Sequence, residues 1–320
     1  MPEAGYPLRT LPLSGMKGVS PAARLAAAAA AGWATVRCAA WMLRSRPDLV
    51  VGAGGYASGP AVLAAMVLRI RTLVIEQNHF PGATNRWLAP RVDAVCVPSE
   101  AARERLGGRG IVTGNPVRAE FASIGPPPGR AEMSILVSGG SRGASSINRA
   151  VVGALPELGR MAPPPRIVHQ TGAADERPVA EGYRGFAGPH EVRAFLGDMP
   201  RRLAEADLAV CRAGATTLAE LAAAGRPAIL VPYPFAADDH QRWNAEEVRA
   251  AGAATVVLDG ELSGPRLAAE IRALAGDPER RRSMAAAARS LAKPEAAARI
   301  ADVADALLQG GAPGEERRVP

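Results

Sequence analysis

Eight short apolar runs recur along the chain, and Ala-rich stretches with helical character separate them. None of the runs alternates apolar with polar residues, which indicates strands that are covered on both faces. Strands of this kind that alternate with helices predict parallel sheets, so we expect an α/β fold. The runs are Leu49–Val51, Thr72–Ile75, Ala94–Val97, Ile135–Val137, Arg166–Val168, Leu208–Val210, Ala228–Val231 and Thr255–Leu258.

A break in composition divides these runs into two sets. The stretch "GPPPGR" at 125–130 interrupts the pattern, and 320 residues with 48% hydrophobic content suffice for two domains with cores of their own. We expect a first domain over 1–120, a second over 121–293, a helix over 294–309 that returns towards the first domain, and a disordered tail over 310–320. Ligands are expected beyond the carboxyl ends of the strands, in a cleft between the halves.

Charge and cysteine content narrow the class of partner. The net charge of +7 favours anionic partners such as nucleotide phosphates or an acidic membrane surface, whereas nucleic acid is disfavoured because the arginines are scattered. Cys38, Cys96 and Cys211 lie far apart in apolar runs without metal-ligand spacing, which predicts reduced core residues. No membrane-spanning helix and no signal peptide is expected.

Two glycine-rich turns follow predicted strands. The stretch "VSGGSRGASSIN" at 137–148 joins a strand to a helix, and its glycines allow an anion to approach free backbone N–H groups at the positive end of the helix dipole. A tight turn that simply needs glycine is the alternative. The stretch "GAGGYASGP" at 52–60 is a second turn of this type. The turn at 137–148 matches neither a dinucleotide-binding nor an ATPase motif.

Polar residues follow several other predicted strands. "EQNH" at 76–79 follows one strand of the first half, and "DDHQRWNA" at 238–245 offers the amides and carboxylates that suit a sugar. Glu220 lies in the helix after Leu208–Val210, with Thr216 and Thr217 as candidate caps. Glu220 could accept hydrogen bonds from ribose hydroxyls or close a capping box.

Several motifs together resemble the MurG family of N-acetylglucosaminyltransferases. They are "GGYASGP", "EQNHFPGATNRW", "TGNPVR", "HQTG", "CRAGATTLAELAAAGRPAILVPYP" and "DDHQRWNA", in this order, within a match from about Pro7 to about Leu308. The resemblance implies a GT-B fold with two Rossmann-like domains, the acceptor and membrane on the first and UDP-N-acetylglucosamine on the second. It implies inverting transfer of N-acetylglucosamine to the 4-hydroxyl of lipid-linked N-acetylmuramoyl-pentapeptide, lipid I to lipid II, in peptidoglycan synthesis.

The resemblance also implies roles for individual residues. On the donor side these are Gly140 and Ser141 at the diphosphate with Asn148 behind them, Phe195 and Leu196 at the uracil edge, Ala215, Thr216 and Thr217 at the diphosphate and ribose, Glu220 at the ribose, His240 and Gln241 at the sugar, and Arg118 near the phosphates. On the acceptor side they are Tyr56, Glu76 and Asn78, of which Glu76 and Tyr56 are the catalytic candidates. No metal site and no cofactor is expected, since UDP-N-acetylglucosamine is a substrate and no Asp-x-Asp motif occurs.

One departure from the family concerns catalysis. Family members begin with a "GGTGGHxxP" loop whose histidine is the favoured general base, and this sequence has no such motif. We therefore expect at least one βα unit, roughly 30 residues or more, to be missing, with an exposed edge strand, an unfilled core and slow transfer as consequences. Two alternatives stay open: a UDP-sugar-binding remnant without catalysis, and another GT-B enzyme such as a lipid glucosyltransferase or a UDP-GlcNAc 2-epimerase.

A predicted helix that starts at Ser20 and Pro21 carries a candidate membrane surface. At helical spacing one stripe holds apolar residues and the next holds tryptophan beside arginine, a pairing typical of an anionic lipid interface. A core helix with snorkelling arginines is the alternative. The stripes are Leu25, Val36 and Leu43, and Trp33, Arg37, Trp41 and Arg44. With a lipid-linked acceptor, we expect a peripheral protein on the cytoplasmic face of the plasma membrane, in contact with other proteins of cell-wall synthesis.

Overall fold

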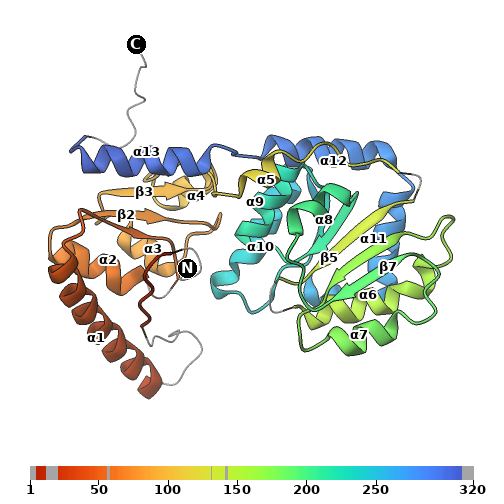
Figure 1. Cartoon of the computed structure of the whole chain (residues 1–320), viewed down its shortest axis with the longest axis horizontal. Coiled ribbons are helices and arrows are strands. Elements are labelled where there is room, and N and C mark those ends of the chain that lie inside the picture. Colours follow the sequence, from red (N-terminus) through yellow and green to blue (C-terminus); the bar gives the residue numbers. More distant parts are fainter. Residues whose placement is uncertain (1–4, 12–20, 56–57, 131, 141–142, 312–320) are drawn as a thin grey trace, which may run out of the picture. The chain divides into compact units, whose positions relative to one another are not determined.

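The computed structural model describes residues 5–11, 21–55, 58–130, 132–140 and 143–311. The chain divides into two compact units, one made of Met1–Gly114 with Ala298–Pro320 and the other of Asn115–Ala297 (Figure 1). All eight predicted strands are present, with ends that agree within two residues. The expected α/β class is confirmed.

In the first unit the described residues form a parallel four-stranded sheet in the order β1-β2-β3-β4. Short helices connect the strands, as the alternating sequence pattern predicts. The elements in chain order are α1 (Pro21–Ser45), β1 (Leu49–Gly52), α2 (Ser58–Val67), β2 (Arg71–Ile75), α3 (Ala83–Leu88), β3 (Ala94–Val97), α4 (Glu100–Arg105) and β4 (Ile111–Val112), with α13 (Ala296–Leu308) added from the far end of the chain.

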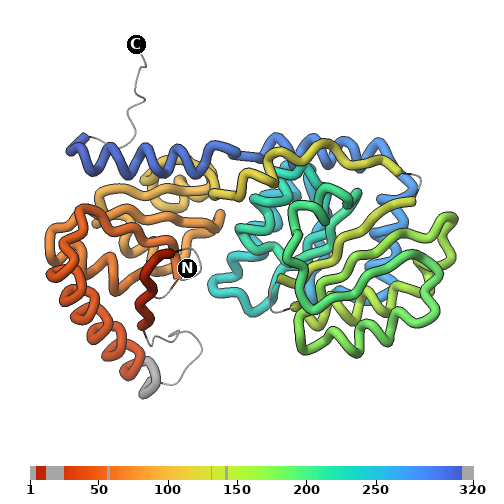
Figure 2. The backbone as a smooth tube through the Cα atoms, in the orientation of Figure 1, coloured from red at the N-terminus to blue at the C-terminus, as the bar shows by residue number. Residues whose placement is uncertain are grey.

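The two faces of this sheet are covered by helices distant in sequence. Residues of α2, α3 and α4 pack with Val74 and Val95 on one face. On the other face Val303 and Leu307 of α13 pack against Leu73 and the neighbouring strand residues. Figure 2 shows this blue helix alongside the orange strands. Consecutive strand residues point to opposite faces, so an unbroken apolar run fills both cores.

The second unit holds a parallel six-stranded sheet, counted over its described residues, in the order β10-β9-β8-β5-β6-β7. The order reverses beside β5, which is the switch point of a doubly wound sheet. Its elements are α5 (Ala119–Ala122), β5 (Ser134–Ser138), α6 (Ser145–Leu158), β6 (Arg166–Gln170), α7 (Glu176–Gly182), β7 (His190–Arg193), α8 (Met199–Glu205), β8 (Leu208–Cys211), α9 (Ala215–Ala224), β9 (Ala228–Leu230), α10 (His240–Ala250), β10 (Ala254–Val256), α11 (Gly264–Ala275) and α12 (Pro278–Ser290).

Two separate cores lie on the faces of the second sheet. Ile135 and Val137 point to the core shared with α6, α7 and α11, whereas Leu136 points to the core shared with α5, α8, α9 and α10. The strands therefore stand fixed between two layers of helices. Their carboxyl ends share one edge, which the loops described below occupy.

Two strands were missed by the apolar pattern. β4 has only two residues, Ile111 and Val112. β7 reads "HEVR" and lies at the edge of its sheet, so its side chains are partly or fully exposed and its polar composition costs little. An apolar run indicates a strand only when both faces of the strand are buried, and neither β4 nor β7 is buried on both faces.

The long helix α1 packs against α2 and presents much of its surface to solvent. Leu25, Val36 and Leu43 are exposed by 74%, 68% and 64%, so the predicted apolar stripe does not face a core in this unit. The predicted start at Ser20 lies outside the described residues. Within the residues that the structure describes, no helix is long and apolar enough to cross a membrane. All three cysteines are free and buried, as predicted.

Candidate functional site

The turn after β5 requires glycine for steric reasons. Gly140 and Gly143 have φ of +83° and +74°, and the Gly143 amide donates to the Gly140 carbonyl at 3.0 Å. A Cβ on Gly143 would lie 2.0 Å from the carbonyl oxygen of Thr171, and one on Gly139 would lie 2.3 Å from the nitrogen of Ala144. The backbone of the turn thus folds back on itself and meets the backbone after β6 without side chains between. Ser141, predicted at the diphosphate, lies outside the described residues.

Two helices begin at this edge without a side-chain cap. The N-caps are Ala144 for α6 and Gly214 for α9, and neither offers a side-chain oxygen to the first-turn N–H groups. Such N–H groups and the helix dipole form an anion site. The prediction that Thr216 and Thr217 cap α9 is wrong, since both lie inside its first turn after Ala215.

Glu220 borders a small pocket on the second unit. Ser138 and Thr217 supply the other polar groups of the lining, and the remainder is mostly apolar, from Leu136, Met199, Leu203, Ala209, Cys211 and Leu221. Burial raises the pKa of the Glu220 carboxyl, while the positive charge of Arg118 acts in the opposite direction. Glu220 is six residues after the N-cap Gly214, so the capping-box alternative is excluded.

Arg118 lies at the start of α5 and is exposed. Its guanidinium stacks 5.0 Å from the centre of the Phe121 ring, which holds the cation beside the first helix of the second unit. Its positive charge opposes the rise in the pKa of Glu220 that burial causes.

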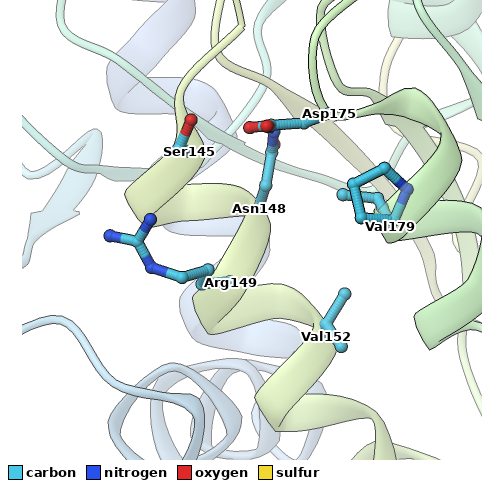
Figure 3. Close-up of a pocket in the computed structure, with 7 residues that line it drawn as sticks. Ser145, Asn148, Arg149, Val152, Asp175 and Val179 are labelled. Atoms are coloured by element: carbon cyan, nitrogen blue, oxygen red, sulfur yellow. The ribbon is translucent and has the colours of Figure 1, made fainter.

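Asn148 is buried behind the turn, and neighbouring residues hold its side chain. Its amide nitrogen donates to the Thr171 carbonyl at 2.9 Å and to Asp175 at 2.8 Å, and its oxygen accepts from Nε2 of His169 at 3.0 Å. Figure 3 shows Asp175 facing Asn148, in a cavity of about 310 Å³ between α6 and α7 that Ser145 and Arg149 also line.

The hydrogen bonds fix the protonation of His169. Because Asn148 uses its nitrogen as donor to two acceptors, its oxygen faces His169, whose Nε2 therefore carries the proton. Nδ1 then accepts from the hydroxyl of Tyr183 at 3.1 Å. Burial lowers the pKa of His169 to about 4, so the ring is neutral.

The loop after β7 is tied to β6 by a side chain. The backbone N–H of Leu196, predicted at the uracil edge, donates to Oε1 of Gln170 at 2.8 Å. Leu196 is buried, whereas the neighbouring Phe195 is 65% exposed. Gln170 belongs to the "HQTG" motif, to which no role was assigned from the sequence.

His240 and Gln241 open α10 at the same edge. Nδ1 of His240 donates to the Ala237 carbonyl at 2.7 Å, and Oε1 of Gln241 accepts from the backbone N–H of Tyr233 at 3.0 Å. Asp238 and Asp239, at φ of 53° and 54°, turn the chain into the helix. Aspartate tolerates this left-handed conformation better than most residues.

Arg212 is a residue of this edge that the sequence reasoning did not single out. It follows β8 and donates to Asp259 at 2.6 Å, to Ser146 at 2.8 Å, and to the carbonyls of Val231 and Pro232. Arg212 thus joins the ends of two strands to the first turn of α6. Its place directly after a buried strand in "CRAG" was the available signal.

In the first unit, Glu76 lies at the carboxyl end of β2 and holds the loop that follows. Oε1 accepts from the backbone and side-chain nitrogens of Asn78 at 2.8 and 3.1 Å. Oε2 accepts from Gly82 at 2.9 Å and from Asn85 at 2.8 Å. Glu76 is 3% exposed, and its two oxygens already accept hydrogen bonds from four N–H donors. An incoming hydroxyl, which the sequence predicts near Glu76, would have to compete with these donors. Tyr56 lies outside the described residues.

Two family models match the chain. The glycosyltransferase family 28 C-terminal domain matches residues 134–301, and the glycosyltransferase family 28 N-terminal domain matches residues 1–97. The first match covers the turn after β5, Glu220 and the start of α10. The second covers the loop held by Glu76.

Individual proteins are similar over nearly the whole chain. The UDP-N-acetylglucosamine--N-acetylmuramyl-(pentapeptide) pyrophosphoryl-undecaprenol N-acetylglucosamine transferase of Anaeromyxobacter sp. (strain Fw109-5) is 44% identical, across 99% of this chain and 85% of that protein. The crystal structure of Acinetobacter baumannii MurG is similar with a TM-score of 0.76 and 28% identity, across 96% of this chain and 86% of that one.

A more distant structural relative shares the fold alone. The UDP-GlcNAc 2-epimerase from Neisseria meningitidis bound to UDP-GlcNAc has a TM-score of 0.66 at 14% identity, across 94% of this chain and 84% of that one. The two-sheet architecture is therefore common to enzymes of different activity.

Proposed function

The chain belongs to the MurG family of glycosyltransferases, and from this we propose that it transfers N-acetylglucosamine from UDP-N-acetylglucosamine to lipid I, which yields lipid II in peptidoglycan synthesis. The structural support for this proposal comes from the residues at the carboxyl edge of the second sheet. There the glycine turn after β5, the uncapped N-termini of α6 and α9, and the pocket of Glu220 occur together.

We propose that this edge binds the nucleoside diphosphate. The turn at Gly140 binds the diphosphate, and the first-turn N–H groups of α9 donate hydrogen bonds to it, with Arg118 as an additional cation. The carboxylate of Glu220 accepts hydrogen bonds from the ribose hydroxyls, and His240 and Gln241 bind the sugar. Preorganised N–H donors stabilise the charge that develops on the leaving UDP. The absence of side-chain caps on both helices supports this assignment.

We propose a single displacement at the anomeric carbon, with inversion. The 4-hydroxyl of the acceptor attacks that carbon, a base removes its proton, and the bond to the UDP oxygen breaks. Glu76 was the expected catalytic group, but its oxygens already accept four hydrogen bonds. We therefore assign to Glu76 the role of positioning Asn78 and the rest of the loop on the acceptor side.

We propose that the protein binds the cytoplasmic face of the plasma membrane through α1. The guanidinium of Arg37 lies 4.7 Å from the Trp33 ring centre and 5.2 Å from that of Trp41, and Arg9 lies 5.1 Å from Trp41. Exposed tryptophan beside arginine suits a headgroup region with anionic lipid. Such a surface would bring the protein to its lipid-linked acceptor.

The test is transfer from labelled UDP-N-acetylglucosamine to a short-chain lipid I analogue. We expect a labelled disaccharide lipid to form only when the acceptor is present. An epimerase would convert UDP-N-acetylglucosamine without acceptor, and a binding remnant would bind UDP and form no product. Either result would overturn the proposal. The E220Q variant, which loses the charged partner for the ribose, controls for transfer by a contaminating enzyme.

A further inference from the structure

Gln170 is the last residue of β6, and its side chain is 2% exposed. Its amide nitrogen donates to the Gly140 carbonyl at 3.0 Å and to the Ser138 hydroxyl at 3.3 Å, and its oxygen accepts from the Leu196 N–H at 2.8 Å. A carbonyl can only accept and a backbone N–H can only donate, so these partners determine which way the amide faces.

The two segments that Gln170 joins are not adjacent in the sheet. The turn at Gly140 follows β5 and the loop at Leu196 follows β7, and β6 lies between these two strands. Backbone pairing from β6 to the β7 side ends with the bond from Gly172 to Ala194. After Ala194, the loop that follows β7 is joined to β6 by the hydrogen bond from the Leu196 N–H to the Gln170 side chain.

The Gly140 carbonyl is held from two directions. The Gly143 amide donates to it at 3.0 Å across the turn, and the Gln170 amide donates to it at 3.0 Å from β6. The far end of the turn rests on the residue that follows β6, because Gly143 packs against the Thr171 carbonyl. Both ends of the turn therefore depend on the "HQT" segment at 169–171.

We propose that Gln170 is a positioning residue that couples recognition of the base to recognition of the diphosphate in the UDP donor. This rests on the proposed function, which assigns the diphosphate to the turn and the base to the Leu196 loop. One amide shared by both segments sets their spacing, because a shift of the Gly140 turn moves the amide on which the buried N–H of Leu196 depends, and a shift of the Leu196 loop leaves the Gln170 oxygen without its donor. A ligand that spans both segments benefits from this spacing, whereas a ligand that contacts one does not.

The experiment compares three ligands on purified full chains by titration calorimetry or displacement: UDP, uridine and pyrophosphate. Gln170→Leu keeps the size of the side chain and removes all three hydrogen bonds. We expect it to raise the Kd for UDP about tenfold and to change the Kd for uridine and for pyrophosphate less than about threefold. In transfer assays KM for UDP-N-acetylglucosamine should rise with kcat largely retained.

Two further variants separate positioning from loss of stability. Gln170→Glu keeps an acceptor for Leu196 and loses the donor to Gly140, so UDP should again bind more weakly while uridine does not. Ile271→Val removes one buried methyl group of α11, remote from both segments, and should lower Tm without changing the Kd for UDP.

The possible results distinguish a failure of the proposed function from a failure of this inference alone. Wild-type protein that binds no UDP would overturn both the proposed function and this inference. Wild-type protein that binds UDP, together with a Gln170→Leu variant that binds it equally, would overturn this inference alone. An equal loss for all three ligands would indicate a general structural role, and tighter UDP binding would indicate that the amide competes with the base for Leu196. Either result would also overturn the inference.

Discussion

The guanidinium of Arg212 lies 2.6 Å from the carboxylate of Asp259, and Ser146 donates to the same carboxylate oxygen at 2.6 Å. Both side chains of the ion pair are largely buried, so the pair is less screened by solvent than the exposed pairs of this protein. The cluster fixes the first turn of α6 relative to the ends of β8 and β9. It therefore determines where the α6 N–H groups lie.

Arg212→Lys should impair donor use, because a single ammonium cannot reach Asp259, Ser146 and two carbonyls together. We expect kcat/KM for UDP-N-acetylglucosamine to fall by about tenfold or more and the free energy of unfolding to fall by about 1–3 kcal/mol. Steady-state kinetics and urea unfolding measure both. Arg272→Gln is the matched control, since the Arg272 side chain is 60% exposed and its pair with Glu157 is open to solvent, so the change should affect neither quantity.

Glu76→Gln should reduce transfer through the loss of loop geometry. A glutamine offers one acceptor oxygen and places its NH₂ group against two N–H donors, at a cost of about 2–3 kcal/mol in unfolding free energy. We expect kcat to fall, Tm to fall, and the pH profile of kcat/KM to keep its shape. Asn85→Ala removes one of the four donors and should have a smaller effect. A fully stable Glu76→Gln protein whose profile has lost its acidic limb would instead identify Glu76 as the base.

Glu220 should make donor binding sensitive to pH. Burial raises the pKa of its carboxyl, and ribose hydroxyls donate to the carboxylate form. As the pH falls through this raised pKa, the free protein becomes protonated and KM for UDP-N-acetylglucosamine should rise. Glu220→Gln should raise KM about tenfold at neutral pH and flatten this dependence. Glu246→Gln, on the surface of α10, should leave the profile unchanged.

His169 should lower the stability of the fold in mild acid. Its pKa is about 4 in the folded chain against an ordinary value of 6.5, so the unfolded chain binds a proton that the folded chain does not. The contribution is complete above pH 6.5 and is lost progressively down to pH 4, which amounts to about 2 kcal/mol between pH 7.5 and pH 5. Urea unfolding at the two pH values measures it. In His169→Gln this part of the pH dependence should vanish, and in Tyr183→Phe it should persist.

Arg37→Glu should weaken binding to vesicles that contain phosphatidylglycerol. The change places a negative charge beside Trp33 and Trp41 and removes the cation that stacks on both rings. We expect less protein to sediment with anionic vesicles and little change with neutral ones. Arg184→Glu, at another exposed position in the second unit, is the control for net charge. Equal loss in the two variants would contradict a specific role for α1.

The sequence was most informative where burial is two-sided. Runs such as Ile135–Val137 identify strands because each residue must pack on one of two cores. β7, with the sequence "HEVR", was not predicted, because an edge strand needs no apolar face on the solvent side. The class of fold and the positions of eight strands and their loops along the chain were thus predictable from the sequence, whereas β4 and β7 were not.

The site was predictable as a set of loops, but not as a set of contacts. The glycines after β5 stand out locally, because the conformation of a turn depends on near neighbours, and the carboxylate in α9 stands out because it lies in a helix directly after a buried strand. The pairing of Gln170 with Leu196 and of Arg212 with Asp259 joins segments far apart in the sequence. Only the sheet order brings them together, so no local pattern could have indicated either pair. For Glu76 the sequence predicted a catalytic role, and its four hydrogen-bond donors favour a structural role in the loop instead.

The placement of α13 has a consequence for synthesis on the ribosome. The second unit is continuous over Asn115–Ala297, so all of it can fold as soon as it has emerged. The first unit is different, because Val303 and Leu307 cover a face of its sheet whose strands emerged roughly 200 residues earlier. That face stays open to chaperones and to other nascent chains until α13 is made, so the first unit begins to emerge before the second and is completed after it.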